Sequence, residues 1–171
     1  MNKFTVPDIC DEHGENIKIC DLFLNSYGKN DKFFGQVETA RCEHSNSIVK
    51  ELVAQNGSNK VLVIQHTGTE KCSMVGDQIA QMAYDNQWKG IITNGYIRDI
   101  EVIKDIPIGV YAKNSYPKKT DKSVGKGEIG STLEFQNFIV QKDSWAYVAV
   151  SYTHLRAHET RHDLVCRLLL E

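Results

Sequence analysis

Long apolar runs are missing from this sequence, and so is an excess of either charge. No stretch approaches the roughly 18 apolar residues that a membrane-spanning helix needs. The first residues, MNKFTVPDICDEHGEN, lack the apolar core of a secretory signal peptide. The formal net charge is -2, which gives no overall attraction to nucleic acid or to an anionic membrane. We therefore expect a cytoplasmic protein that contacts neither membranes nor, directly, nucleic acid.

Cysteine pairs at metal-binding spacing are also missing. The sequence has no C-x-x-C pair, and its cysteines are widely scattered, at Cys10, Cys20, Cys42, Cys72 and Cys166. This distribution is unlike a zinc site or a disulfide framework. Buried free thiols are the simpler expectation.

The composition is that of an ordinary globular domain. The chain has 171 residues, of which 41% are hydrophobic and 25% are charged. This length fits one domain with one core. Small-molecule chemistry is the function class that this composition favours.

Hydrophobic spacing predicts a mixed α/β order of elements. Apolar residues recur at helical intervals in 5–24, where a His-Gly pair divides two short predicted helices. A strand is predicted over 33–42 and a helix over 47–57. Alternation further on predicts strands at 106–111, 131–140 and 145–148.

The middle of the chain predicts a βαβ unit. Residues 60–65 form a short apolar run typical of a buried parallel strand, 77–89 an amphipathic helix, and 91–93 the next strand. Ligands of such units lie beyond the carboxyl ends of the strands. The loops 66–76 and 94–99 are therefore expected to converge on a site.

Those loops carry an Asp-X20-Arg-Asp pattern formed by Asp77, Arg98 and Asp99. A helix beginning at Asp77 offers unpaired backbone N–H groups to an anion, and Gly76 permits close approach. Arg98 can bind a carboxylate through two parallel hydrogen bonds, and Asp99 supplies a hard oxygen ligand for Mg²⁺. The structural alternative is that Asp77 only caps its helix, while Arg98 and Asp99 pair on a surface turn.

Consecutive blocks of residues 4–148 resemble the aldolase-like family typified by the regulator of ribonuclease activity A. These blocks are FGQVETARCEHSNSIVKEL, GSNKVLVI, GDQIAQMAYDNQWKGIITNGYIRDI and IPIGVYAKNSYPKK. The resemblance implies a single-domain αββ-type sandwich with a βαβ core, similar to the swivelling phosphohistidine-domain-like fold. It also implies a homotrimer or hexamer with active sites between subunits.

The same resemblance implies a chemistry for the site. The family includes class II, metal-dependent 4-hydroxy-4-methyl-2-oxoglutarate aldolases, which also decarboxylate oxaloacetate through a pyruvate enolate. Arg98 would then grip the carboxylate of a small 2-oxo acid, and Asp99 would hold a mostly hydrated Mg²⁺ or Mn²⁺ ion. Asp77 would support the metal's water ligands, and backbone amides around Gly76, Gln78 and Ile79 would face the substrate.

A second function class stays open, because the family also includes non-catalytic regulators that bind and inhibit ribonuclease E. These regulators often lack an acid after the arginine, so the presence of Asp99 favours the enzyme.

The end of the chain differs in character from the rest. Residues 150–171 resemble the translation of a transposon-based sequencing adaptor, so we predict a family domain over 1–149, cut short near Val148, and a non-native tail. The tail contains an H-E-x-x-H match at 158–162, which in other contexts marks a zinc protease. We expect the tail to pack poorly or to form an isolated helix.

Three further features favour structural interpretations. A G-x-G-x-x-G match at 125–130 leads into a predicted strand and opens no helix, unlike a dinucleotide site. A lysine-rich stretch over 113–126 is typical of a solvated loop, although it could touch RNA. His66, which follows a strand, could be an acid or a ligand but is more often structural in such a position.

Overall fold

The structure is a computed structural model, and it describes residues 5–14, 17–20, 22–121, 127–136, 138–151 and 165–170. Within these ranges, no helix has the length and apolar character required to span a membrane.

Parallel strands form the centre of the main sheet. β3, β4, β6 and β7 lie side by side in this order, each parallel to its neighbour. Their bounds are Lys32–Cys42, Lys60–His66, Gly90–Ile97 and Gly109–Ser115. Parallel neighbours need crossover connections, which α2 (Ser47–Val53), α3 (Asp77–Asp85) and α4 (Ile100–Ile103) supply.

Antiparallel strands extend the sheet on both sides. β11 (Trp145–Ser151) pairs with β3, and beyond it lie β12 (Val165–Leu170) and β1 (Lys18–Cys20). At the other edge, β2 (Asn25–Ser26) pairs with β7. Shorter strands are β5 (Ser73–Val75) on β6, β8 (Glu128–Ile129) on β3, and the hairpin of β9 (Leu133–Phe135) and β10 (Phe138–Val140).

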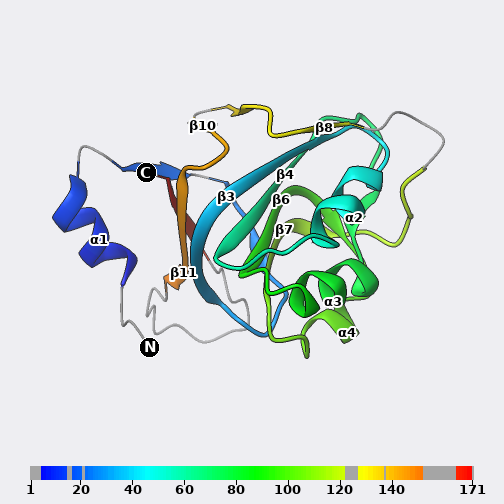
Figure 1. The fold of residues 1–171 in the computed structure, drawn as a ribbon, viewed down its shortest axis with the longest axis horizontal. Coiled ribbons are helices and arrows are strands. Elements are labelled where there is room, and N and C mark those ends of the chain that lie inside the picture. Colours follow the sequence, from blue (N-terminus) through cyan, green and yellow to red (C-terminus); the bar gives the residue numbers. More distant parts are fainter. Residues whose placement is uncertain are drawn as a thin grey trace, which may run out of the picture.

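Three helices lie together beside the parallel strands, and one lies at the opposite end of the molecule (Figure 1). The group consists of α2 (Ser47–Val53), α3 (Asp77–Asp85) and α4 (Ile100–Ile103). The separate helix, α1 (Val6–His13), begins where the Thr5 side chain accepts a hydrogen bond from the Asp8 amide, and it ends at Gly14.

The centre of the sheet is buried on both faces, as its continuous apolar strands require. Along β4, Leu62 and Ile64 face the core under the helices, whereas Val61 and Val63 face a second core. The second core is covered by β9, β10 and β11, which contribute Leu133, Phe138, Val140, Ala146 and Val148. Helices α2, α3 and α4 thus lie on one face of the parallel strands, because their buried side chains belong to the first core.

The predicted α/β class is confirmed, as is the βαβ unit, because β4 and β6 are parallel neighbours joined through α3. The second helix predicted in 5–24 is wrong. Residues 18–20 instead form β1, whose backbone pairs with β12.

The expectation of a poorly packed or helical tail is also wrong for Val165–Leu170. These residues form β12, which is paired on one side with β11 and on the other with β1. The H-E-x-x-H match at 158–162 lies outside the described residues, as do 122–126 of the lysine-rich stretch. The adaptor origin of the tail stays a prediction.

Candidate active site

The two loops that follow β4 and β6 converge, as the sequence predicted. The His66 amide donates to Asn94 Oδ1 at 2.7 Å, and Asn94 Nδ2 donates back to the His66 carbonyl at 3.2 Å. Farther along, β5 pairs with the end of β6, and the Arg98 amide donates to the Val75 carbonyl at 3.1 Å. These bonds place the start of α3 against the end of β6.

The start of α3 carries Asp77 on its first turn. The first intrahelical bond runs from the Ala80 amide to the Gly76 carbonyl at 3.0 Å, so the preceding amides have no partner within the helix. One of them is engaged locally, because the Gln78 amide donates to Asp77 Oδ1 at 2.7 Å. Asp77 therefore satisfies a donor that the sequence analysis expected to face a substrate.

The end of β6 presents an ion pair. Arg98 Nε donates to Asp99 Oδ2 at 3.1 Å, and the two side chains are 41% and 36% exposed. Asp99 has φ 57° and ψ 37°, a left-handed conformation that aspartate and asparagine tolerate better than most residues. This turn ends the strand and starts α4, so the pair projects from the strand end.

Gly76 lies directly beside this ion pair. A Cβ atom at Gly76 would stand 2.9 Å from Asp99 Oδ2, so a side chain here would displace the carboxylate of the pair. The close approach of α3 to β6 thus depends on glycine at this position.

A cavity of about 640 Å³ opens at this junction. Five of the six predicted site residues line it: Gly76, Asp77, Gln78, Ile79 and Arg98. Asp99 does not itself line the cavity, but its carboxylate is paired with Arg98, which does. The helix start and the arginine are therefore brought to one site.

The opposite wall of the cavity was not predicted from the sequence. It includes Asn46, Lys50 and Ser73 and the segment 118–121. The Ser73 amide donates to the Lys118 carbonyl at 2.9 Å, and Thr120 Oγ1 donates to Asn46 Oδ1 at 2.9 Å. These bonds hold the segment over the helix start.

The cavity lining carries more positive than negative side chains. Lys50, Arg98, Lys118 and Lys119 face it, against Asp77 and Asp121. Lys118 is ion-paired with Glu70 at 2.8 Å, and this hydrogen bond raises the lysine's pKa. Arg98 and Lys118 are each paired with an acid outside the lining, Asp99 and Glu70, so their charges are partly compensated. Lys50 and Lys119 add further positive charge that could attract a small anion.

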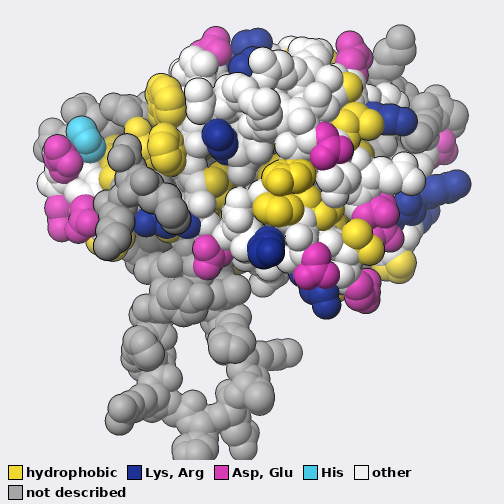
Figure 2. All heavy atoms as spheres, turned by 60° about the horizontal axis from the view of Figure 1, so that its bottom comes forward, with side chains coloured by type: hydrophobic (Ala, Val, Ile, Leu, Met, Phe, Trp, Pro, Cys, Tyr) yellow, Lys and Arg dark blue, Asp and Glu magenta, His cyan; other side chains and the backbone are white. Residues whose placement is uncertain are grey.

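Basic and acidic side chains are mixed on one face of the molecule. On the face shown in Figure 2, basic and acidic side chains are interspersed, with hydrophobic side chains among them.

Both interactions of the structural alternative are also present, namely the Asp77 contact with its own helix and the Arg98–Asp99 pair. They do not decide between the two interpretations, because the same side chains line or adjoin the cavity.

Fold and site together define an α/β domain with a cavity at the carboxyl ends of parallel strands, lined by a helix start, an arginine and lysines. The RraA-like family model, described as Aldolase/RraA, matches residues 6–149, and the chain belongs to this family. The predicted family membership is thereby confirmed.

Curated relatives cover most of the chain. A protein of Marinomonas sp. (strain MWYL1), named "Putative 4-hydroxy-4-methyl-2-oxoglutarate aldolase", is 39% identical over 145 residues, which are 85% of this chain and 89% of the relative. A protein of Vibrio vulnificus (strain YJ016) with the same name is 37% identical, over 85% of this chain and 90% of the relative.

Solved structures share the fold. A Geobacillus kaustophilus structure, titled as an S-adenosylmethionine:2-dimethylmenaquinone methyltransferase, has a TM-score of 0.84 at 28% identity and covers 98% of this chain and 94% of its own. The structure titled as the RNA-processing inhibitor RraA of Thermus thermophilis has a TM-score of 0.83 at 24% identity, covering 98% and 93%. At this identity, the second likeness concerns the fold alone.

Proposed function

We propose that this chain is a divalent-metal-dependent carbon–carbon lyase that acts on small 2-oxo acids. Its reactions would be retro-aldol cleavage of 4-hydroxy-4-methyl-2-oxoglutarate to pyruvate, decarboxylation of oxaloacetate, or both. The observation that carries the proposal is the cavity in which Arg98, paired with Asp99, faces the start of α3. The names of the curated relatives point to the same chemistry.

The cavity suits these substrates because both are dicarboxylates. The Arg98 guanidinium would bind the carboxylate next to the 2-oxo group through two parallel hydrogen bonds. Lys50, Lys118 and Lys119 line the same cavity and would attract the second carboxylate. One carboxylate of the substrate would thus be held by directed hydrogen bonds to Arg98, and the other mainly by the positive charge of the lysines.

Asp99 is the residue that would hold the metal. Its carboxylate is 36% exposed, so a hydrated ion can reach it, and carboxylate oxygens suit Mg²⁺ or Mn²⁺. When bound, such an ion would polarise the 2-oxo group and stabilise the negative charge that develops as the carbon–carbon bond breaks.

The chain's own residues would supply orientation and charge stabilisation. Arg98 fixes the substrate carboxylate, and the positive end of the α3 dipole faces the same space. The Gln78 amide, now bonded to Asp77, would be shared with a bound anion. Asp77 would then hold water molecules around the ion.

Pyruvate release tests this proposal. The purified protein, freed of metal by a chelator, is incubated with oxaloacetate or 4-hydroxy-4-methyl-2-oxoglutarate, with and without added Mg²⁺ or Mn²⁺. We expect turnover of at least one substrate that depends on the ion. Turnover of neither substrate would contradict the lyase and favour the second class, a regulator that binds a ribonuclease E-like enzyme.

We also propose that the protein forms a homotrimer or hexamer, as the family resemblance implies. Light scattering of the purified protein gives the mass that tests this assembly, and a monomer would contradict it.

A further inference from the structure

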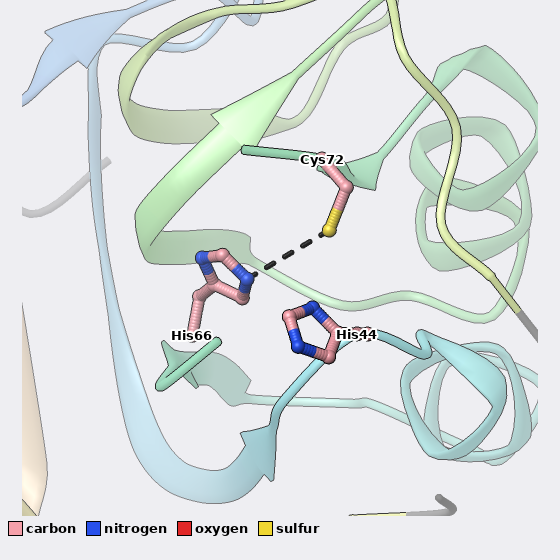
Figure 3. Close-up of side chains that lie close together, drawn as sticks. All are labelled: His44, His66 and Cys72. Atoms are coloured by element: carbon pink, nitrogen blue, oxygen red, sulfur yellow. Dashed lines mark hydrogen bonds between the residues drawn. The ribbon is translucent and has the colours of Figure 1, made fainter. Parts of the chain in front are cut away.

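A second group of potential metal ligands lies outside the lining of the cavity. It consists of His44, two residues after β3, His66 at the end of β4, and Cys72 just before β5. One ligand atom from each residue lies within 4.8 Å of the other two. Figure 3 shows the two imidazole rings and the thiol turned toward a common space.

The spacing of these atoms is close to that of a zinc site. Cys72 Sγ and His66 Nε2 are 3.7 Å apart. In tetrahedral coordination, Zn–S and Zn–N bonds of about 2.3 and 2.0 Å separate two ligand atoms by roughly 3.5 Å. The other separations are no more than 4.8 Å, so a shift of the His44 ring, whose side chain is 21% exposed, would bring all three into this range.

We propose that His44, His66 and Cys72 bind one Zn²⁺ ion, with a fourth position left for water or another small ligand. Two imidazoles and a thiolate are softer donors than carboxylates and select zinc over magnesium. This site is distinct from Asp99 and does not depend on the proposed lyase activity.

Neighbouring residues orient the two histidine rings in a way that suits metal binding. The His66 ring hydrogen-bonds to the backbone of Glu43, and burial lowers the pKa of its imidazole, which favours the neutral form that binds metals. Such a bond from a ligating histidine to a backbone group is typical of metal sites, because it orients the ring. Gly68 packs against the His44 ring, where a Cβ atom would stand 2.7 Å from Cε1 and Nδ1.

The ion can reach the site, and its binding requires only that the thiol releases a proton. Cys72 is 3% exposed, whereas His44 reaches the surface and offers a path for the ion. On binding, the Cys72 thiol loses its proton to solvent and the Sγ–Zn bond forms, without any redox step.

Zinc at this position would join three strand ends that also frame the cavity. Asn46 and Ser73, which line the cavity, lie two residues from His44 and one residue from Cys72. An ion bound only by the folded chain stabilises it by mass action. The zinc-loaded protein should therefore melt at a higher temperature than the metal-free protein.

The test is titration of the full, metal-free chain with Zn²⁺, and with Co²⁺ as its spectroscopic substitute. One Co²⁺ per chain should produce a thiolate-to-cobalt charge-transfer band in the near ultraviolet. Cys72→Ser should abolish that band, and His44→Gln or His66→Gln should weaken Zn²⁺ binding by about 100-fold or more, since loss of even an outer-shell partner costs 10–100-fold.

Matched controls test thiols and histidines in α1 and in the tail. Cys10→Ser and His13→Gln change the same residue types in α1, and Cys166→Ser and His158→Gln change them in the tail. All four variants should keep the band and the affinity of the parent, as should Asp99→Asn. Circular dichroism checks that each variant is folded.

A parent protein that binds no Zn²⁺ at micromolar concentration would overturn the proposal. So would a charge-transfer band that survives Cys72→Ser or disappears in Cys166→Ser. Each of these results leaves the lyase proposal untouched, because its metal dependence is tested at Asp99.

Discussion

A Cβ atom on Gly76 would lie 2.9 Å from Oδ2 of Asp99, so the start of α3 and the end of β6 meet at a glycine. This close approach brings Asp77, which follows Gly76, near Arg98 and Asp99, the other two residues of the Asp-X20-Arg-Asp pattern. Any side chain at Gly76 would displace the carboxylate, or the arginine that is paired with it.

Gly76→Ala should therefore impair activity with little loss of stability. Gly76 has φ -128° and ψ -175°, an extended conformation that alanine adopts freely. The added methyl would shift Asp99, and a misplacement of about 1 Å can cost on the order of 100-fold in rate. Pyruvate release and urea unfolding measure the two effects. Gly14→Ala is the control, because nothing lies within 4 Å of its Cβ position; unchanged kinetics in Gly76→Ala would contradict the predicted role of this contact.

Asp99→Asn should lower kcat at least about tenfold, because metal charge stabilisation is worth several kcal/mol. Asparagine tolerates the left-handed conformation of Asp99, so the backbone should be preserved. Partial recovery is expected at high Mg²⁺, since the amide still offers an oxygen but carries no charge. The measurement is pyruvate release as a function of Mg²⁺ concentration. Asp105→Asn, an exposed acid outside the cavity lining, should behave like the parent, and full activity in Asp99→Asn would end the lyase proposal.

Arg98→Ala should impair activity in a different way from Asp99→Asn. Losing the hydrogen bonds of this charged group costs roughly 1.5–3 kcal/mol of binding. kcat/KM should therefore fall by the corresponding factor, and KM should rise. Added metal should not restore it, because the missing group binds the substrate carboxylate. Steady-state kinetics over a range of Mg²⁺ concentrations separates this outcome from that of Asp99→Asn. Lys104→Ala, an exposed cation outside the cavity lining, is the control, and recovery of Arg98→Ala by metal would argue against a carboxylate clamp.

The sequence predicted the elements that carry their own periodic signal. β4, α3 and β6 were recognisable because apolar runs and helical spacing extend over whole elements. Once these were placed, chain topology brought Asp77 and Arg98 to the same edge of the sheet. β1 was not recognisable, because a strand of three residues shows no period and its partner β12 lies at the other end of the chain.

The remaining parts of the site depend on contacts between distant residues. The lysine-rich stretch was visible, but only its backbone bond to Ser73 shows that Lys118 and Lys119 cover the cavity. The group formed by His44, His66 and Cys72 has no local motif. The parallel register of β3 and β4, in which Cys42 pairs with His66, brings the two histidines together.

The Phe33 ring offers a test of packing between strands. Cβ atoms on Gly90 and Gly109 would stand 2.2 and 2.1 Å from ring atoms of Phe33, so the ring lies over both glycines. Gly109→Ala should lower the free energy of unfolding by about 1–3 kcal/mol, because overpacking displaces the ring. Urea unfolding measures the loss. In a Phe33→Leu background the same change should cost less, and strict additivity of the two losses would show that the ring is not the cause.

Removal of residues 152–171 tests the predicted boundary of the family domain. A chain that stops at Ser151 loses β12, so β11 loses a neighbour and β1 loses its sheet partner. Stability should fall by at least about 1 kcal/mol, since each lost hydrogen bond contributes a net amount of this order. Activity per folded molecule should be unchanged, because the cavity is built from 46–50, 73–82, 98 and 118–121.

Urea unfolding and pyruvate release measure the two quantities, with His158→Gln in the full chain as the control that keeps β12. A shortened chain that folds but releases no pyruvate would show that the tail contributes to the site, and would refute its interpretation as a non-native addition.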